Sequence, residues 1–296
     1  MRAVIISRTR GADARVAGEG KERLDKLVVD LGLAPTRSRA QAMIMAGDVR
    51  VDGRPVGKAG TLVPRGADVS ATARPQWASR GAHKLLGAFE AFPCLRAEGR
   101  ACVDVGASTG GFTDVLLTRG ARRVFAVDVG RGQLLWRLAS DPRVVTMDRT
   151  NARELTAEMF DEPVELAVCD ASFISLRLIL PAIDRVLCPE GEAIVLIKPQ
   201  FEAGRERLAR SGAKGVVRDP AVHADVLREV LSFAHEVTAL RPTGLTWSPM
   251  KGPAGNIEFL CHLTREDRAS EPDVEAVVQG AWRALGDGAE DGGDET

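Results

Sequence analysis

Seven apolar runs of five to eight residues follow one another between residues 101 and 263, and helix-length segments lie between them. Examples are ACVDV at 101–105, VELAVCD at 164–170 and EAIVLIKP at 192–199. Nearly continuous apolar strands that alternate with helices predict a mostly parallel sheet with helices on both faces. The expected fold is therefore a doubly wound, Rossmann-like α/β domain with a sheet of seven strands.

Charged side chains stand at or near the carboxyl ends of successive runs, and ligands bind at this edge of an open α/β sheet. A single acid in such a place is often only a helix N-cap. Five charged residues in succession indicate a ligand site instead. They are Asp104, Asp128, Asp148, Asp170 and Lys198.

The first run leads into a loop of small residues, CVDVGASTGGFTDVLL at 102–117. A phosphate-binding Walker loop would end in Gly-Lys-Ser/Thr, and the chain has no lysine between Lys84 and Lys198. A dinucleotide fingerprint needs a second glycine two residues after Gly106, where Ser108 stands. The loop therefore argues against a triphosphate and against a nicotinamide dinucleotide.

Asp104 and the glycines of this loop suit a cofactor with a cationic end, because a carboxylate can pair with an ammonium group. Asp128 is placed to accept the hydroxyls of a ribose, and Asp148 and Asn151 are placed to face an adenine. These requirements describe S-adenosylmethionine, with a generic nucleotide as the alternative. Phe112 is expected mainly to pack under the loop. The predicted cofactor-binding residues are Asp104, Gly106, Ala107, Ser108, Gly110, Gly111, Phe112, Asp128, Val129, Asp148, Asn151 and Asp170.

A small basic module precedes the α/β domain. Residues 1–77 carry 14 Lys and Arg against 8 Asp and Glu, although the whole chain has a net charge of −1. KERLDKLVVDLGLA and TRSRAQAMIMAG predict two short helices, and Asp52-Gly53 predicts a hairpin turn. We expect a compact α+β module over 21–70 with an anionic partner.

The stretch RLDKLVVDLGLAPTRSRAQAMIMAGDVRVDGRPV closely resembles the small RNA-binding domain that ribosomal protein S-four shares with pseudouridine synthases and tyrosyl-tRNA synthetases. The resemblance implies that the turn and helix at Arg37, Ser38 and Arg39 contact folded RNA, and Arg50 lies just downstream. Phosphate contacts of this kind supply affinity that depends on salt, without reading base sequence.

Four further residues complete a second resemblance. Lys84 in ASRGAHKLL, Asp170 in CDASFISL, Lys198 in IVLIKPQFEAG and Glu258 in PAGNIEFL resemble the K-D-K-E tetrad of the FtsJ-like 2′-O-ribose methyltransferases. The motifs are most similar to those of the TlyA (hemolysin A) family of ribosomal RNA methyltransferases, whose members also carry an S-four-like module. The resemblance implies a class I methyltransferase fold, S-adenosylmethionine as cofactor, and cytidine 2′-hydroxyls of 16S and/or 23S ribosomal RNA in the cytoplasm as substrate.

The tetrad suits this chemistry, because a ribose hydroxyl is a poor nucleophile at neutral pH and its proton must leave as it attacks. Our hypothesis is that Lys198 orients and deprotonates the 2′-hydroxyl, with Lys84 as a neighbouring ammonium. Asp170 and Glu258 would hold the two lysines and keep the site near neutral. Asp170 also favours the charged form of lysine, so the sequence leaves the proton-transfer role of each lysine open.

The remaining segments divide the chain as follows. We expect a flexible leader over 1–20, a linker over 71–79, the methyltransferase domain over 80–268, and a C-terminal amphipathic helix with an acidic tail over 269–296. A long loop over 202–218 is expected to contact RNA and to order on binding. Its basic residues are Arg205, Arg207, Arg210, Lys214 and Arg218.

Composition limits the other functions. Five scattered cysteines lack the spacing of a metal site, so no metal is expected, and no run approaches the roughly 18 apolar residues of a membrane helix. We expect a cytoplasmic monomer. Two alternatives stay open, a membrane-active hemolysin and a non-catalytic RNA-binding or ribosome assembly factor.

Overall fold

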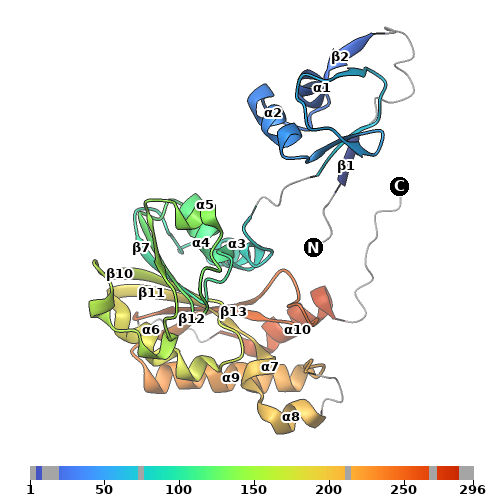
Figure 1. Ribbon diagram of the computed structural model, residues 1–296. Helices are drawn as coiled ribbons and strands as arrows, with labels where there is room; N and C mark the ends of the chain where they lie inside the picture. The colour runs from blue at the N-terminus through green and yellow to red at the C-terminus, as the bar shows by residue number, and fades with distance from the viewer. Residues whose placement is uncertain (1–4, 9–19, 73–76, 211–214, 267–271, 287–296) are drawn as a thin grey trace. The chain divides into compact units, whose positions relative to one another are not determined.

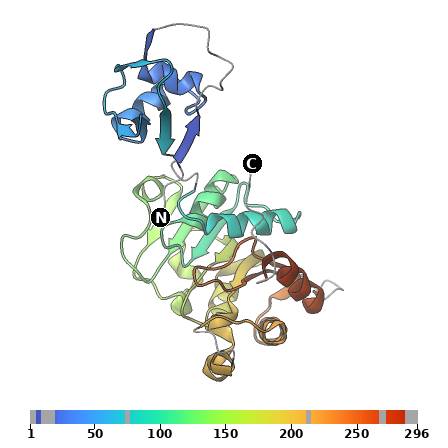
Figure 2. The ribbon, with the colours of Figure 1, turned by 90° about the vertical axis from the view of Figure 1, so that its right-hand side faces the viewer.

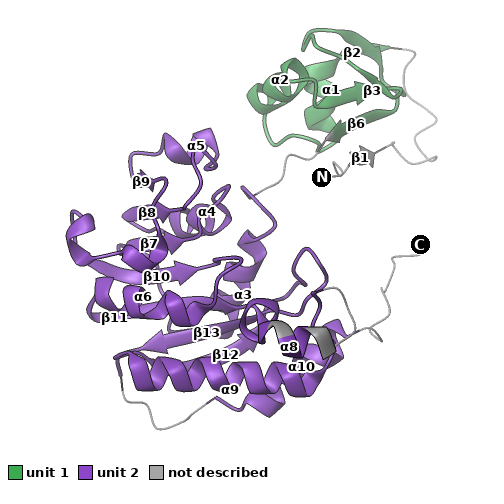
Figure 3. Cartoon of the chain, turned by 60° about the horizontal axis from the view of Figure 1, so that its bottom comes forward, with its two compact units in different colours: residues 1–76 green, residues 77–296 purple. Residues whose placement is uncertain are grey.

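The computed structural model describes residues 5–8, 20–72, 77–210, 215–266 and 272–286. The chain divides between Gln76 and Trp77 into two compact units, which are coloured separately in Figure 3. Residues 71 and 72, expected in a linker, are the last two residues of a strand of unit 1, and residues 73–76 of that linker lie outside the described ranges.

Unit 1 is a small α+β module. A four-stranded antiparallel sheet has the order β1-β6-β3-β4, and β2 pairs with β5 separately. Leu24, Leu27, Val28 and Ile44 from the two helices fill the centre of its core. The elements are β1 (Ile5–Arg8), β2 (Lys21–Arg23), α1 (Leu24–Asp30), α2 (Arg37–Met45), β3 (Val49–Val51), β4 (Arg54–Pro55), β5 (Leu62–Pro64) and β6 (Val69–Thr72).

The start of α2 and the Asp52-Gly53 turn have the conformations that their sequences favour. The Thr36 hydroxyl accepts a hydrogen bond from the Arg39 N–H and so caps α2. Asp52 and Gly53 have φ of 48° and 76°, and positive φ at both positions is what a type I′ hairpin turn requires.

The expectation of a flexible leader is wrong for Ile5–Arg8. This segment is strand β1, which pairs antiparallel with β6 from Ile5 opposite Thr72 to Arg8 opposite Val69. The pairing satisfies backbone groups along β6 that an edge strand would leave unpaired. Residues 1–4 and 9–19 of the expected leader lie outside the described residues.

Unit 2 contains a seven-stranded sheet with the order β12-β13-β11-β10-β7-β8-β9 (Figure 1). Neighbours from β11 to β9 are parallel, and β13 runs antiparallel to β11 and β12. The mostly parallel sheet predicted from the apolar runs is therefore confirmed. Its strands are β7 (Ala101–Val105), β8 (Arg123–Val127), β9 (Val144–Met147), β10 (Val164–Cys169), β11 (Leu187–Ile197), β12 (Arg241–Trp247) and β13 (Phe259–Thr264).

Helices cover both faces of this sheet, with α3 and α4 on one side and α9 on the other (Figures 1 and 2). Successive strand residues contribute to opposite cores, so Cys102 belongs to the same buried cluster as Leu85 of α3, whereas Val103 belongs to the cluster of Val226 of α9. The helices are α3 (Ala82–Ala91), α4 (Gly111–Thr118), α5 (Trp136–Ala139), α6 (Leu180–Val186), α7 (Pro199–Glu202), α8 (Gly204–Arg210), α9 (Pro220–Val237) and α10 (Val274–Leu285), with short 3₁₀ turns η2 (Ala152–Glu154), η3 (Ala157–Met159) and η4 (Leu176–Leu178).

The strand order reverses at β7, because the chain passes outward to β8 and β9 and then returns to β10 on the other side. Such a reversal opens a crevice beyond the carboxyl ends of the strands, where ligands bind in α/β folds. The register aligns these ends, since Val105 lies opposite both Val127 and Cys169. Ile197 lies opposite Phe259, which brings the residue after β11 beside the residue before β13.

Two predicted segments differ from the structure. The expected loop over 202–218 is helical in its first part, where α7 and then α8 extend to Arg210. The apolar run EVTALRP at 236–242 is the sixth of the seven expected strands, but the strand lies later, at Arg241–Trp247, because α9 continues to Val237. The C-terminal helix forms as α10, and residues 287–296 of the acidic tail lie outside the described part of the chain.

Candidate active site

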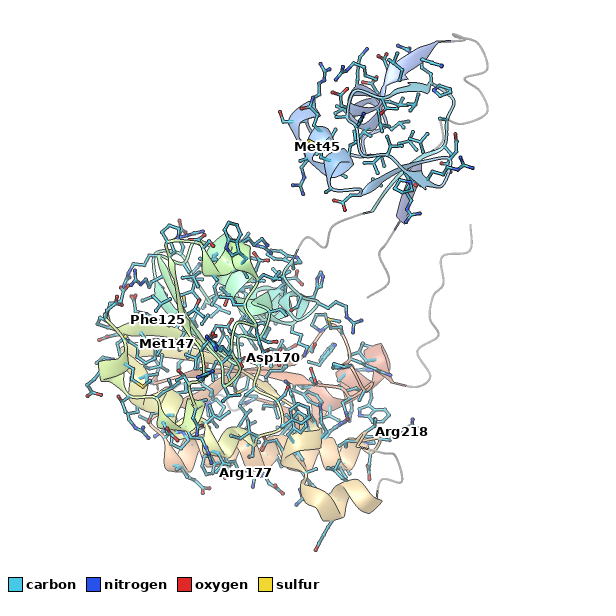
Figure 4. The ribbon with its side chains drawn as sticks, viewed as in Figure 1. Met45, Phe125, Met147, Asp170, Arg177 and Arg218 are labelled. Atoms are coloured by element: carbon cyan, nitrogen blue, oxygen red, sulfur yellow. The ribbon has the colours of Figure 1, made fainter. Side chains whose placement is uncertain are left out.

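The four tetrad residues come together at the carboxyl edge of the sheet. Lys84 lies in α3, Asp170 follows β10, Lys198 follows β11, and Glu258 precedes β13. Lys84 Nζ is 2.7 Å from Glu258 Oε2 and 3.7 Å from Asp170 Oδ2, and Lys198 Nζ is 2.6 Å from Asp170 Oδ1. Two positive and two negative charges therefore alternate along one connected group, and Asp170 lies toward the middle of unit 2 (Figure 4).

Burial makes this arrangement necessary. Lys84, Lys198 and Glu258 are buried, and a buried charge is costly unless it is paired. Glu258 is packed closely, since a Cβ on Gly252 would overlap its carboxylate. Removing one member of the tetrad would leave a neighbouring charge uncompensated.

Lys198 also contacts Ser172, a residue that the sequence did not indicate. Its Nζ donates to the Ser172 hydroxyl at 2.7 Å and to the Asp170 carbonyl at 3.3 Å, and it forms an ion pair with the Asp170 carboxylate. Three oxygens therefore surround this ammonium group, which carries three hydrogens. Asp170 and the exposed Ser172 together therefore fix the position of the Lys198 ammonium group.

Asp104 is the next-to-last residue of β7, at the sheet edge where α/β folds bind ligands, and it is fully buried. Its Oδ2 accepts hydrogen bonds from the Thr113 N–H at 2.8 Å and the Thr113 hydroxyl at 2.6 Å, whereas Oδ1 has no hydrogen-bond partner. Burial raises the pKa of Asp104 to about 7. An orphaned acidic oxygen of this kind fits the ammonium group of a cofactor such as S-adenosylmethionine.

The glycine-rich loop is shaped by close packing. Gly106 has φ of 83°, and a Cβ there would lie 3.1 Å from the Ala171 backbone, so the loop passes directly against the end of β10. Gly110 has φ of 97°, and a Cβ there would overlap the side chain of Leu138. Ser108 adopts the left-handed conformation with φ of 48° although it has a side chain.

The acids of the next two strands accept hydrogen bonds mainly from the backbone. Asp128 Oδ2 accepts from the Ser108 N–H at 2.9 Å and Oδ1 from the Gly130 N–H at 2.7 Å. Asp148 Oδ2 accepts from the Gly132 N–H at 2.7 Å. These bonds tie the turns after β8 to the glycine-rich loop, and the second lone pair of each oxygen remains for a ligand hydroxyl.

Other predicted cofactor residues differ in what they offer. Val129 is 71% exposed beside Asp128, so its side chain is open to a ligand, and Ala107 is buried within the loop. Phe112 is buried in the core, so its ring does not face a ligand, as expected for packing under the loop. Asn151 caps η2 by accepting from the Arg153 N–H and also donates to Glu154, so both ends of its amide have partners within its own turn.

Phe173 is a candidate site residue that sequence reasoning missed. Its side chain is 91% exposed, its backbone has φ of 65°, and its ring centroid is 5.2 Å from that of Phe201. It follows Ser172, which contacts Lys198. Phenylalanine is usually buried, so the sequence carries no signal for this exposed ring.

The predicted RNA contacts fall into two groups. Arg37, Ser38, Arg39 and Arg50 are exposed on unit 1, and Arg37 Nε also donates to buried Asp25 at 3.0 Å. In unit 2, Arg207 pairs with Glu229 of α9 at 2.5 Å, so it is not a free loop cation. The side chains of Arg205 and Arg210, and all of Lys214, lie outside the described residues.

Two features are absent from the described residues. No helix among them is long and apolar enough to cross a membrane. Nor do the described parts of the chain contain a cluster of three or more histidine, cysteine, aspartate or glutamate residues that could hold a metal ion.

Comparison with known proteins adds the family. Residues 77–265 match the FtsJ-like methyltransferase model, and residues 22–69 match the S4 domain model. The chain is 45% identical to the 16S/23S rRNA (cytidine-2′-O)-methyltransferase TlyA of Mycobacterium tuberculosis, over 90% of this chain and 98% of that protein. It is 39% identical to Hemolysin A of Brachyspira hyodysenteriae, over 81% of this chain and 99% of that protein.

A solved structure supports the same assignment. A hemolysin-named protein from Streptococcus thermophilus has 40% sequence identity and a TM-score of 0.66, covering 90% of this chain and 98% of that one. Each of these matches spans nearly the whole of the relative. The chain therefore belongs to the FtsJ-like methyltransferase family, in the branch that carries an N-terminal S4 domain.

Proposed function

We propose that this protein transfers a methyl group from S-adenosylmethionine to ribose 2′-hydroxyls of cytidines in ribosomal RNA. One observation carries the proposal. The tetrad of Lys84, Asp170, Lys198 and Glu258 is assembled beside a crevice where Asp104 offers an orphaned oxygen. The 45% identity to an rRNA (cytidine-2′-O)-methyltransferase supports cytidine in ribosomal RNA as the substrate, which puts the reaction in the cytoplasm.

The donor side of the crevice is built to hold the cofactor, whose sulfonium supplies an activated methyl group. Asp104 would pair with the ammonium group of the cofactor, and Asp128 would accept hydrogen bonds from its ribose hydroxyls. The glycine-rich loop between them brings backbone within reach, because Gly106 and Gly110 leave no side chain in the way.

The tetrad handles the acceptor hydroxyl. Methyl transfer is an in-line displacement, so holding the reacting groups in place supplies most of the rate enhancement. After its ammonium has released one proton to solvent, Lys198 keeps two hydrogens for Asp170 and Ser172, and its lone pair accepts the proton of the 2′-hydroxyl as the oxygen attacks the methyl group. Asp170 holds Lys198. Glu258 holds Lys84, which also lies beside the Asp170 carboxylate.

Unit 1 and Phe173 provide two separate kinds of RNA contact. The exposed basic residues at the start of α2 suit phosphates, whose contacts position RNA without reading its sequence. Phe173 offers an exposed ring beside the tetrad, and aromatic rings of this kind stack on unpaired RNA bases. We infer that the base of the target nucleotide stacks on Phe173 while its ribose faces Lys198.

The test is methylation of ribosomal subunits that lack the modification, using the full chain and radiolabelled S-adenosylmethionine. We expect label in ribosomal RNA, and 2′-O-methylcytidine as the labelled nucleoside after digestion. Label in protein or in a base, or no label with cofactor bound, would contradict the proposal. The last result would support a non-catalytic assembly factor.

A further inference from the structure

Glu202 is a buried acid outside the tetrad for which the mechanism above has no use. It is the last residue of α7, its side chain is 1% exposed, and burial raises its pKa. A buried carboxylate is expensive unless hydrogen bonds compensate it. The partners of Glu202 therefore show what the carboxylate is for.

Both main partners lie in one segment, residues 171–176, which follows Asp170. Glu202 Oε2 accepts from the Ser175 hydroxyl at 2.6 Å, and Oε1 accepts from the Leu176 N–H at 2.7 Å. The nearest guanidinium nitrogen, Arg177 Nε, is 4.0 Å away, so the carboxylate bonds chiefly to this segment. Glu202 thus anchors the far end of residues 171–176.

The near end of the segment is anchored on the same short helix. Ser172 accepts a hydrogen bond from Lys198, which is the N-cap residue of α7, and Glu202 ends that helix. The two ends of α7 therefore hold the two ends of the segment. Within α7, Phe201 also contacts Phe173, with ring centroids 5.2 Å apart.

The backbone between the anchors is strained. Phe173 has φ of 65°, a conformation that costs a residue other than glycine free energy and persists only where its surroundings enforce it. The bonds at Ser172, Ser175 and Leu176 supply that constraint. Without the bonds to Glu202, the segment would relax and Ser172 would leave Lys198.

We propose that Glu202 is a positioning residue for methyl transfer, which fixes residues 171–176 so that Ser172 holds Lys198 and Phe173 faces the substrate. This inference rests on the proposed ribose methylation at the same site. Glu202 acts through the segment and touches neither the cofactor site nor the tetrad side chains by any contact found in the structure's described residues.

The experiment compares Glu202→Ala, Glu202→Gln, Ser172→Ala and the double variant Glu202→Ala/Ser172→Ala in the full chain. Glu229→Gln is the matched control. Glu229 lies on α9, pairs with Arg177 of η4 and Arg207 of α8, and has no bond to residues 171–176. Kinetics on ribosomal subunits give kcat and KM, and amide hydrogen exchange reports the order of residues 171–176 without any RNA.

Glu202→Ala should lower kcat by about tenfold to hundredfold, because small displacements of positioned groups have effects of this size. Its KM for S-adenosylmethionine should change less than about twofold, and residues 172–176 should exchange faster. Glu202→Gln should retain more activity, since its amide oxygen can still accept from the Leu176 N–H. The Glu202→Ala and Ser172→Ala effects should not add, whereas Glu229→Gln should match wild type in kcat and exchange.

Several results would overturn the proposal. They are wild-type kcat in Glu202→Ala, unchanged exchange at 172–176, or additive effects in the double variant. If Glu202→Ala does not fold, Glu202→Gln and its coupling to Ser172→Ala decide the question. If the wild-type protein methylates no RNA, the proposed function has failed, and hydrogen exchange alone then decides whether Glu202 holds the segment.

Discussion

The donor crevice is formed by Asp104, Asp128, Asp148 and the glycine-rich loop. It lies at the same edge of the same sheet as the tetrad, yet the charged side chains of the two sites are held in opposite ways. Asp128 and Asp148 accept from backbone N–H groups, and Asp104 accepts from both the backbone and the hydroxyl of Thr113. The tetrad residues instead bind one another.

The difference separates two tasks. Backbone donors fix the acids of the donor crevice wherever the fold forms, and they leave acceptor capacity for a ligand that brings its own positive charge. In the tetrad the charges already compensate one another, so the incoming hydroxyl has only to exchange hydrogen bonds. The crevice should therefore respond to substitution through affinity for the cofactor, and the tetrad through kcat.

The largest expected effect tests this separation in the tetrad. Lys198→Ala removes the group that binds the 2′-hydroxyl, and loss of a positioned proton acceptor typically lowers the rate by about 10²–10⁴-fold. We expect kcat to fall by this amount, while the Kd for S-adenosylmethionine, measured by calorimetry, changes less than about threefold. A kcat near that of wild type, or loss of cofactor binding in a folded variant, would break the comparison.

The next effect tests the crevice. Asp104→Asn retains an oxygen for Thr113 but loses the charge that pairs with an ammonium, and charge-assisted hydrogen bonds contribute about 1.5–3 kcal/mol. The Kd for S-adenosylmethionine should rise about tenfold to hundredfold, with a much smaller effect on kcat at saturating cofactor. Asp141→Asn is a surface control, because Asp141 pairs only with neighbouring Arg143 in its described contacts.

The same residue predicts a pH dependence. Burial raises the pKa of free Asp104 to about 7, so below pH 7 the acid is mostly protonated and must lose its proton to pair with the cofactor. Affinity should therefore fall as pH falls through 7, by about tenfold per unit well below that value, and level off above pH 8. Asp104→Asn should remove this dependence, and an unchanged profile in the variant would assign it to another group.

These comparisons also show what the sequence could predict. The apolar runs were sufficient for the sheet, and the acids that end them lie at its carboxyl edge, because both follow from patterns local to each strand. The tetrad was different. Glu258 and Lys198 are 60 positions apart, and only the antiparallel register of β13 against β11 brings them to one edge. Resemblance to a family supplied what periodicity could not.

The features that were missed share a physical cause. Ile5–Arg8 forms a strand by pairing with the edge of β6. The sequence of α8 is rich in charge and has no apolar periodicity. Ser172 and Glu202 take part in contacts between the segment after β10 and the segment after β11, and no local sequence pattern predicts such contacts. Tertiary contacts determine these segments, so a single sequence does not reveal them.

The smallest expected effect sharpens the comparison most. Ser108 has φ of 48°, its N–H donates to Asp128, and its hydroxyl donates to Gln133 at 3.3 Å. Ser108→Gly keeps the backbone bond to Asp128 and suits positive φ, but it loses the hydroxyl and adds freedom to the unfolded chain.

These opposing contributions should nearly cancel, so we expect a change in the free energy of unfolding below about 1 kcal/mol and a cofactor Kd within about threefold of wild type. Gly110→Ala is the contrasting variant, because its added Cβ would overlap Leu138 and displace the loop backbone. It should weaken cofactor binding far more than Ser108→Gly, in chemical denaturation and calorimetry done side by side. If Ser108→Gly were the more damaging of the two, side chains rather than backbone would hold the donor crevice, and its contrast with the tetrad would disappear.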